Sequence, residues 1–142
     1  MIRQTPTVLL VEDDEVDVMV IRRAFQKSRI QAPLVVASDG MEALEILRGE
    51  GGKSRLAPPY IVLLDLNMPR MNGIEFLDEL RRDPELRTTV VFVLTTSDAP
   101  GDVQAAFAHC VAGYFCKRSL SDYQGTVDFI GAYLAIGLLS GA

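Results

Sequence analysis

Five short apolar runs alternate with amphipathic stretches along the chain. The runs cover residues 7–11, 34–37, 60–64, 90–94 and 113–116, and β-branched or aliphatic residues are common in them. Such runs are typical of strands that are buried on both faces of a sheet. The other stretches have helical periodicity: one begins at residue 14, and the rest cover residues 41–47, 73–82, 103–110 and 121–138. This alternation predicts a parallel sheet with right-handed crossovers and helices on both faces.

The first predicted helix has one apolar face. Val16, Val20, Ala24 and Phe25 recur on it at helical spacing. We therefore expect these four side chains to face the core. Asp17 lies off that face, so we expect it to face water together with the charged residues later in the helix.

Length and charge narrow the class of protein. A chain of 142 residues is the size of one domain, and no second domain is visible in the pattern. The net charge of −5 argues against a nucleic-acid-binding surface, because phosphate neutralisation needs clustered Lys and Arg. The first residues lack the apolar core of a signal peptide, and no run approaches the roughly 18 apolar residues of a membrane span. We therefore expect a cytoplasmic protein that binds neither nucleic acid nor membrane.

Polar residues follow four of the predicted strands at the point where the apolar run ends. They are Glu12 and Asp13 after the first strand, Asp65 after the third, Thr95 after the fourth and Lys117 after the fifth. Because the carboxyl ends of parallel strands lie on one edge of a sheet, these side chains should converge. Taken singly, Asp65 is explained as a turn cap, Lys117 as a surface lysine and Thr95 as a strand-end residue. Their joint placement favours a functional site.

The predicted cluster has the chemistry of a phosphoryl acceptor. Carboxylates that lie close together stay ionised near neutral pH when a cation sits among them. Hard oxygen ligands that leave room for phosphate suit Mg²⁺, and the backbone carbonyl of Asn67 can add a ligand. A carboxylate beside Mg²⁺, Lys117 and the Thr95 hydroxyl is suited to receive a phosphoryl group, because charge accumulates on the three transferring oxygens.

Four groups of residues around these strand ends form a specific set of motifs. They are residues 9–14 (LLVEDD), 64–69 (LDLNMP) followed by 72–73 (NG), 93–97 (VLTTS) and 114–117 (YFCK). With these motifs the chain resembles the receiver domain of two-component response regulators over essentially its whole length. The resemblance implies a flavodoxin-like, doubly wound (βα)5 sandwich with strand order 2-1-3-4-5. It also implies a single receiver domain over residues 1–142, without an output domain.

The resemblance implies a role for each acidic residue at the site. Asp65 looks like the phosphoacceptor, which takes its phosphoryl group from a sensor histidine kinase. Glu12 and Asp13 look like the acidic pair that binds Mg²⁺ together with Asp65 and the carbonyl of Asn67. The family consists of phosphoacceptor signalling proteins that assist their own phosphotransfer, so we do not expect an enzyme.

The resemblance also implies how the signal leaves the site. Thr95 looks like the switch hydroxyl that follows the phosphoryl group, and Tyr114 like the aromatic residue that rotates inward with it. Lys117 looks like the cation that contacts the phosphoryl oxygens. Thr95 takes the switch role in preference to Thr96, because the small residue after it and the 22-residue step to Lys117 fit the family register.

Two features depart from the usual pattern of the family that the chain resembles. Arg118 stands where receivers usually carry a proline, often in the cis form, and the loop before the third strand is unusually long. The long loop, the Thr-Thr-Ser sequence and the lack of an output domain look like the stand-alone regulators that partner bacteriophytochrome-type kinases. Such regulators often form homodimers through the fourth helix, the fifth strand and the fifth helix. The apolar residues 129–139 predict such a self-association patch.

Two other functions start from the same residues. A phosphatase or phosphotransferase that uses Asp65 as its nucleophile would normally need a second acid two residues later, where this chain has Asn67. A phosphorylation-independent protein-binding module could use the same fold. The crowded carboxylates argue against the second alternative, because a purely structural module has no need for them.

Overall fold

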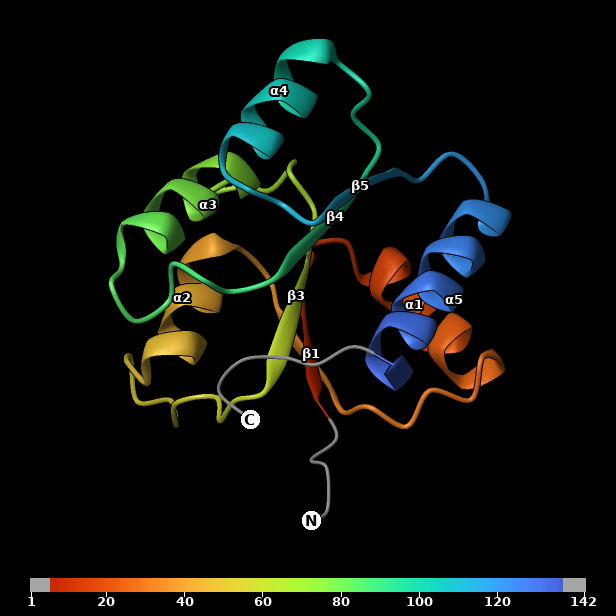
Figure 1. The fold of residues 1–142 in the computed structure, drawn as a ribbon, viewed down its shortest axis with the longest axis horizontal. Helices are drawn as coiled ribbons and strands as arrows, with labels where there is room; N and C mark the ends of the chain where they lie inside the picture. Colours follow the sequence, from red (N-terminus) through yellow and green to blue (C-terminus); the bar gives the residue numbers. More distant parts are fainter. Residues whose placement is uncertain (1–5, 137–142) are drawn as a thin grey trace.

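A five-stranded parallel sheet forms the centre of the computed structural model, which describes residues 6–136 (Figure 1). The strands are β1 Thr7–Val11, β2 Leu34–Ala37, β3 Tyr60–Leu64, β4 Val91–Thr95 and β5 Gly113–Cys116, in the order β2-β1-β3-β4-β5. The register sets Val11 beside Leu64 and Thr95 beside Cys116. The residues that follow paired strands therefore emerge side by side at one edge of the sheet.

Helices cover both faces of the sheet. In the described residues they are α1 Glu15–Lys27, α2 Gly40–Arg48, α3 Gly73–Arg82, α4 Pro100–Ala108 and α5 Leu120–Ile136. Helices α1 and α5 pack together on one face, while α2, α3 and α4 lie on the other (Figure 1). Each face has its own apolar cluster, with Ile21 and Val127 buried under α1 and α5, and Leu47 and Leu77 under the opposite layer.

The predicted fold class and strand order are confirmed, with small differences at the ends of elements. Strand β4 begins and ends one residue later than predicted, so Thr95 is its last residue. Helix α4 begins at Pro100 rather than residue 103, because a proline is tolerated in the first turn, where its missing N–H has no helical partner. Residues 137 and 138 of the last predicted helix lie outside the described residues, as do residues 137–139 of the predicted apolar patch.

Two other sequence-based expectations concern the whole chain. The single-domain organisation stays a prediction. Among residues 6–136, no helix is long and apolar enough to cross a membrane.

The orientation of α1 corrects the prediction for its first turn. Val16 is 67% exposed, whereas Ile21, Ala24 and Phe25 are buried. The expectation that Asp17 faces water was also wrong, because its side chain is only 20% exposed and pairs with Lys117. Helical periodicity correctly identifies the apolar face in the middle of α1. The orientation of its first turn depends instead on the ion pair between Asp17 and Lys117.

Candidate functional site

The ends of β1 and β3 place two buried carboxylates side by side. The Glu12 N–H donates to the carbonyl of Ala37 at 2.9 Å, and the Asp65 N–H donates to the carbonyl of Val11 at 3.0 Å. Both residues thus continue the strand hydrogen bonding by one residue. The Glu12 and Asp65 side chains are buried, while Asp13 is exposed. The cluster therefore opens to solvent on the Asp13 side.

The loop that follows Asp65 is held back against the strand end. The Asn67 N–H donates to Oδ1 of Asp65 at 3.3 Å. The Gly73 N–H donates to the carbonyl of Leu66 at 3.0 Å. Asn72 then caps α3, and its side chain and that of Glu75 form a reciprocal capping box. The Asn67 bond thus orients the Asp65 carboxylate, and the other bonds hold the loop that carries Asn67.

Lys117 reaches the carboxylates from the end of β5. Its side chain is 2% exposed, and Nζ lies 2.6 Å from Oε2 of Glu12 and 2.7 Å from Oδ2 of Asp17. The distance from Nζ to Oδ2 of Asp65 is 3.7 Å. The ammonium group therefore hydrogen-bonds to Glu12 and Asp17, and pairs with Asp65 at longer range.

Burial and neighbouring charges shift the pKa values of these groups. Burial raises the pKa of Glu12 to about 7, against the lowering effect of the Lys117 hydrogen bond. Burial would lower the pKa of Lys117, but its hydrogen bonds to Asp17 and Glu12 and the charge of Asp65 raise it overall. The pKa of Asp17 is lowered, because hydrogen bonds from Lys117 and Tyr123 outweigh its burial. Lys117 is therefore a fixed positive charge inside the site.

Thr95 and Tyr114 lie at the adjoining strand ends. Thr95 is fully buried, and its Oγ1 accepts from the Ser97 N–H at 3.4 Å. Its carbonyl accepts from the Lys117 N–H at 2.8 Å. The Tyr114 hydroxyl donates to the carbonyl of Ser97 at 2.7 Å. Both predicted switch residues therefore contact the same segment between β4 and α4.

Arg118 follows Lys117 through a trans peptide bond, and its partners lie outside the acidic cluster. Among residues 6–136 the cis peptide bond is the one between Pro58 and Pro59, so the bond from Lys117 to Arg118 is trans. The Arg118 N–H donates to Oδ2 of Asp122 at 2.8 Å, and its guanidinium pairs with Asp98 at 3.2 Å. The missing proline is thus accommodated without a non-proline cis bond.

The acidic cluster has the donor set of a divalent-metal site. One carboxylate oxygen from each of Glu12, Asp13 and Asp65 lies within 4.8 Å of the other two. Carboxylate oxygens at this spacing suit a hard cation, and three of them leave positions for water or phosphate. The Asp65–Asn67 hydrogen bond brings the main chain of Asn67 to the same place. These residues therefore fit the metal that the sequence analysis expects.

Two residues of the site were missed by sequence analysis. Asp17, from the first turn of α1, binds Lys117, and the Tyr123 hydroxyl from α5 donates to Oδ1 of Asp17 at 2.6 Å. Neither residue follows a strand, so the strand-end argument could not identify them. An acidic residue four positions after Asp13 is the one available signal, because it lies one helical turn beyond the acidic pair.

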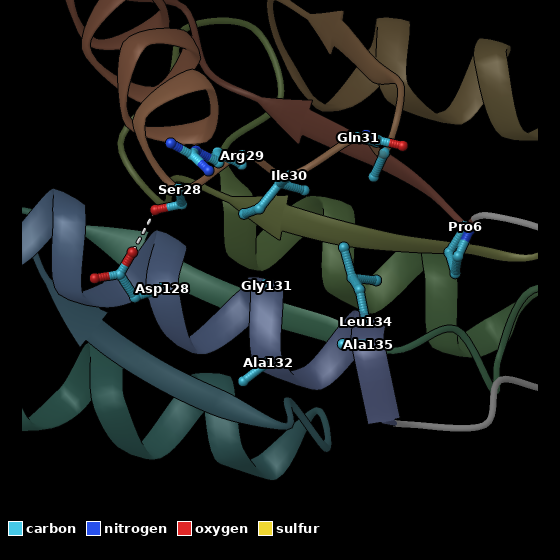
Figure 2. Close-up of a pocket in the computed structure, with 11 residues that line it drawn as sticks. Pro6, Ser28, Arg29, Ile30, Gln31, Asp128, Gly131, Ala132, Leu134 and Ala135 are labelled. Carbon is cyan, nitrogen blue, oxygen red and sulfur yellow. Dashed lines mark hydrogen bonds between the residues drawn. The ribbon is translucent and has the colours of Figure 1, made fainter.

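A groove of about 530 Å³ lies at the opposite end of β1, between the α1–β2 connection and α5 (Figure 2). Its lining includes Ile30, Leu134 and the hydrogen-bonded pair of Ser28 and Asp128. It shares no residue with the acidic cluster, which follows the other end of β1. The groove is therefore separate from the candidate site.

Comparisons with known proteins agree with this geometry. Residues 8–123 match the family model described as the response regulator receiver domain. Response regulator Rcp1 of Synechocystis is 36% identical over 127 residues, which cover 89% of this chain and 86% of Rcp1. The probable methanogenesis regulatory protein FilR2 of Methanothrix harundinacea is 39% identical over 128 residues, which cover 89% of this chain and 81% of FilR2.

Solved structures show the same similarity. The phosphorylated cyanobacterial phytochrome response regulator RcpA has a TM-score of 0.87 at 32% identity, with 96% of this chain and 99% of RcpA covered. The Mn²⁺-bound form of Rcp1 has a TM-score of 0.83 at 33% identity, with 94% of this chain and 98% of Rcp1 covered. The similarity therefore extends to proteins of nearly the same length.

Proposed function

We propose that this chain, which belongs to the family of response regulator receiver domains, accepts a phosphoryl group on Asp65. The observation that carries the proposal is the position of this carboxylate, buried at the end of β3 with Oδ2 3.7 Å from the Lys117 ammonium. An Asp65 oxygen bonds to phosphorus as the bond from phosphorus to the imidazole nitrogen of the donor breaks. Lys117 stabilises the charge on the transferring oxygens, so the chain assists its own phosphotransfer.

Receiver domains bind a divalent metal at an acidic pocket, and we propose that the metal here is Mg²⁺. Glu12, Asp13, Asp65 and the carbonyl of Asn67 would hold it. The three carboxylate oxygens within 4.8 Å of one another support this assignment. When bound, the cation neutralises charge on the phosphoryl oxygens. The similar protein Rcp1 has been crystallised with Mn²⁺, which is a hard cation of the same charge.

The donor of a receiver domain is a histidine kinase, and we propose a bacteriophytochrome for this chain. The support is the similarity to RcpA, which is described as a phytochrome response regulator. Val16 and Met19 of α1 are exposed apolar side chains close in sequence to Asp17. They offer the kinase a contact surface at the start of α1, the helix whose Asp17 pairs with Lys117. A cytoplasmic location without nucleic-acid or membrane binding belongs to the same proposal.

We propose that phosphorylation changes a protein-binding face through Thr95 and Tyr114. In this proposal the buried Thr95 hydroxyl follows the phosphoryl group, and Tyr114 moves with the segment that carries Ser97. The face on α4, β5 and α5 carries Phe107, Phe129 and Ile136 as exposed apolar side chains. Such side chains support a homodimer that forms through this face.

Intact mass after incubation with acetyl phosphate and Mg²⁺ tests the phosphoacceptor. We expect one phosphoryl adduct on the wild type and on Asp98→Asn, whose side chain is exposed, and none on Asp65→Ala. Omission of Mg²⁺ should slow labelling. An adduct that persists on Asp65→Ala would contradict the assignment. A folded wild type that takes no label would favour the phosphorylation-independent binding module.

Sedimentation of a charged variant tests the dimer face. Ile136 is 82% exposed on α5, whereas Met41 is 45% exposed on α2 in the opposite layer. We expect Ile136→Asp to shift the protein towards monomer and Met41→Asp to leave its association unchanged, because a buried charge opposes association. Equal association in both variants would place the interface elsewhere.

A further inference from the structure

Lys117 is held by a residue outside the acidic cluster. Its Nζ lies 2.7 Å from Oδ2 of Asp17, a residue of α1, but 3.7 Å from Oδ2 of Asp65. An ammonium group has three donors, and Glu12 and Asp17 use two of them. In this state the ammonium group therefore engages Asp17 more closely than the carboxylate that it is expected to serve.

The second oxygen of Asp17 connects the same pair to α5. The Tyr123 hydroxyl donates to Oδ1 of Asp17 at 2.6 Å, while Oδ2 accepts from Lys117. Asp17 and Tyr123 lie in the first turns of α1 and α5, two helices that pack together. A continuous chain of hydrogen bonds thus runs from Lys117 through Asp17 to Tyr123.

We propose that Asp17 is a positioning residue that holds the Lys117 ammonium before phosphorylation, and that Tyr123 transmits the release of this hold to α5. The proposal rests on the proposed function of Asp65. Phosphorylation replaces the single negative charge of the Asp65 carboxylate with roughly two negative charges on the phosphoryl oxygens. These oxygens form next to an ammonium group that is already 3.7 Å from Asp65. The phosphoryl oxygens therefore compete with Asp17 for the ammonium group. Helix α5 responds by a route that does not require Thr95 or Tyr114.

The different exposure of the two charges allows this exchange. Lys117 is 2% exposed, so its ammonium must keep anionic partners inside the protein. Asp17 is 20% exposed, so water can solvate its carboxylate when the ammonium leaves. Moving the ammonium from Asp17 to the phosphoryl group therefore leaves neither charge buried without a partner. The loss of the ion pair also changes the charge that the Tyr123 hydroxyl faces.

Fluorine NMR of protein labelled with 3-fluorotyrosine reads this route directly. The chain has four tyrosines, so Tyr→Phe variants assign every signal. Beryllium fluoride with Mg²⁺ serves as the phosphoryl mimic. We expect the Tyr114 and Tyr123 signals to shift in the wild type. The Tyr60 signal should not shift, because Tyr60 lies five residues before Asp65, which is about 17 Å along the strand.

Two variants separate the two routes. In Thr95→Ala the Tyr123 signal should still shift on addition of the mimic, while the Tyr114 shift is reduced. In Asp17→Asn the Tyr123 signal should no longer respond, because the amide no longer competes as an anion for Lys117. Glu15→Gln removes the same charge from an exposed position in the same helical turn and should behave as wild type.

Labelling rates with acetyl phosphate test the hold on Lys117 separately. Asp17→Asn should label roughly three to five times faster than wild type, the change expected when a partly exposed competing ion pair is removed. Tyr123→Phe keeps the packing of the ring and gives a second test: it should also label faster, because Asp17 loses a partner that orients it. Tyr133→Phe, ten residues or about 15 Å further along α5, should label at the wild-type rate.

The outcomes also separate this proposal from the proposed function. If Tyr114 shifts with the mimic but Tyr123 does not, Asp65 acts as proposed and the route through Asp17 is refuted. If Asp17→Asn and Tyr123→Phe both label at the wild-type rate, Asp17 does not hold the ammonium group. If no tyrosine signal responds and no label is taken up, the phosphoacceptor assignment fails, and the Asp17 proposal fails with it.

Discussion

Gly73, the first residue of α3, packs closely against the backbone of Asp65 and Leu66 at the end of β3. A Cβ atom at Gly73 would lie 2.7 Å from the carbonyl oxygen of Asp65, 2.7 Å from Cα of Leu66 and 2.8 Å from its Cδ2. Two of these are backbone atoms, so rotation of a side chain cannot relieve the contact. Gly73→Ala must therefore displace either the start of α3 or the backbone at Asp65.

The expected magnitude follows from this overpacking. An extra carbon forced into a packed site costs about 1–3 kcal/mol of the free energy of unfolding. Gly125 in α5 is the matched control, because a Cβ atom there meets no atom within 4 Å. Replacing an exposed helical glycine with alanine stabilises a helix by roughly 0.5–1 kcal/mol. The two Gly→Ala changes should therefore have opposite signs.

Urea unfolding followed by circular dichroism measures both free energies of unfolding. Gly73→Ala should also label more slowly with acetyl phosphate, because displacement of the Asp65 backbone misplaces the carboxylate that attacks phosphorus. Gly125→Ala should label at the wild-type rate. The reasoning is refuted if Gly73→Ala is as stable as Gly125→Ala, since the close contact would then be relieved without cost.

Two other substitutions test the frame around the site. Burial alone would raise the pKa of Asp39, but the hydrogen bonds from Arg70 and from backbone N–H groups, together with the Arg70 charge, lower it overall. The ionised carboxylate therefore stabilises the fold above the unfolded pKa of about 3.9, and this stabilisation is lost as the pH falls through the lower folded pKa. In urea unfolding, Asp39→Asn should therefore reduce the free energy of unfolding by roughly 1 kcal/mol at pH 7 and by less near pH 3. A reduction that does not depend on pH would refute the charge argument. Arg81 donates to four backbone carbonyls around the ends of α3 and α4, so Arg81→Lys should lower the thermal midpoint and reduce the free energy of unfolding by about 2 kcal/mol. Arg82→Lys is the control, because Arg82 is exposed, and it should change the midpoint little. Equal midpoints for the two variants would show that a lysine can replace the guanidinium hydrogen bonds.

The strand-end residues of the site were predictable from the sequence for a geometric reason. Parallel strands end on one edge of the sheet, so the first polar residue after each apolar run is delivered to the same place. The structure accordingly brings Glu12, Asp65 and Lys117 within ion-pair distance, although Lys117 is 105 residues from Glu12 in the chain. The strand bounds followed from the same apolar runs, with a one-residue difference at β4.

Residues that reach the site from helices were not predictable in this way. Helical periodicity placed Val16 in the core and Asp17 in water, and the structure reverses both expectations. The reversal follows from the buried ammonium of Lys117, which binds Asp17 in the first turn of α1 as well as Glu12. That pairing is set by a residue 100 positions away, so no window of local sequence contains it. Tyr123 follows from the same pairing, because its hydroxyl satisfies the Asp17 oxygen that Lys117 leaves free.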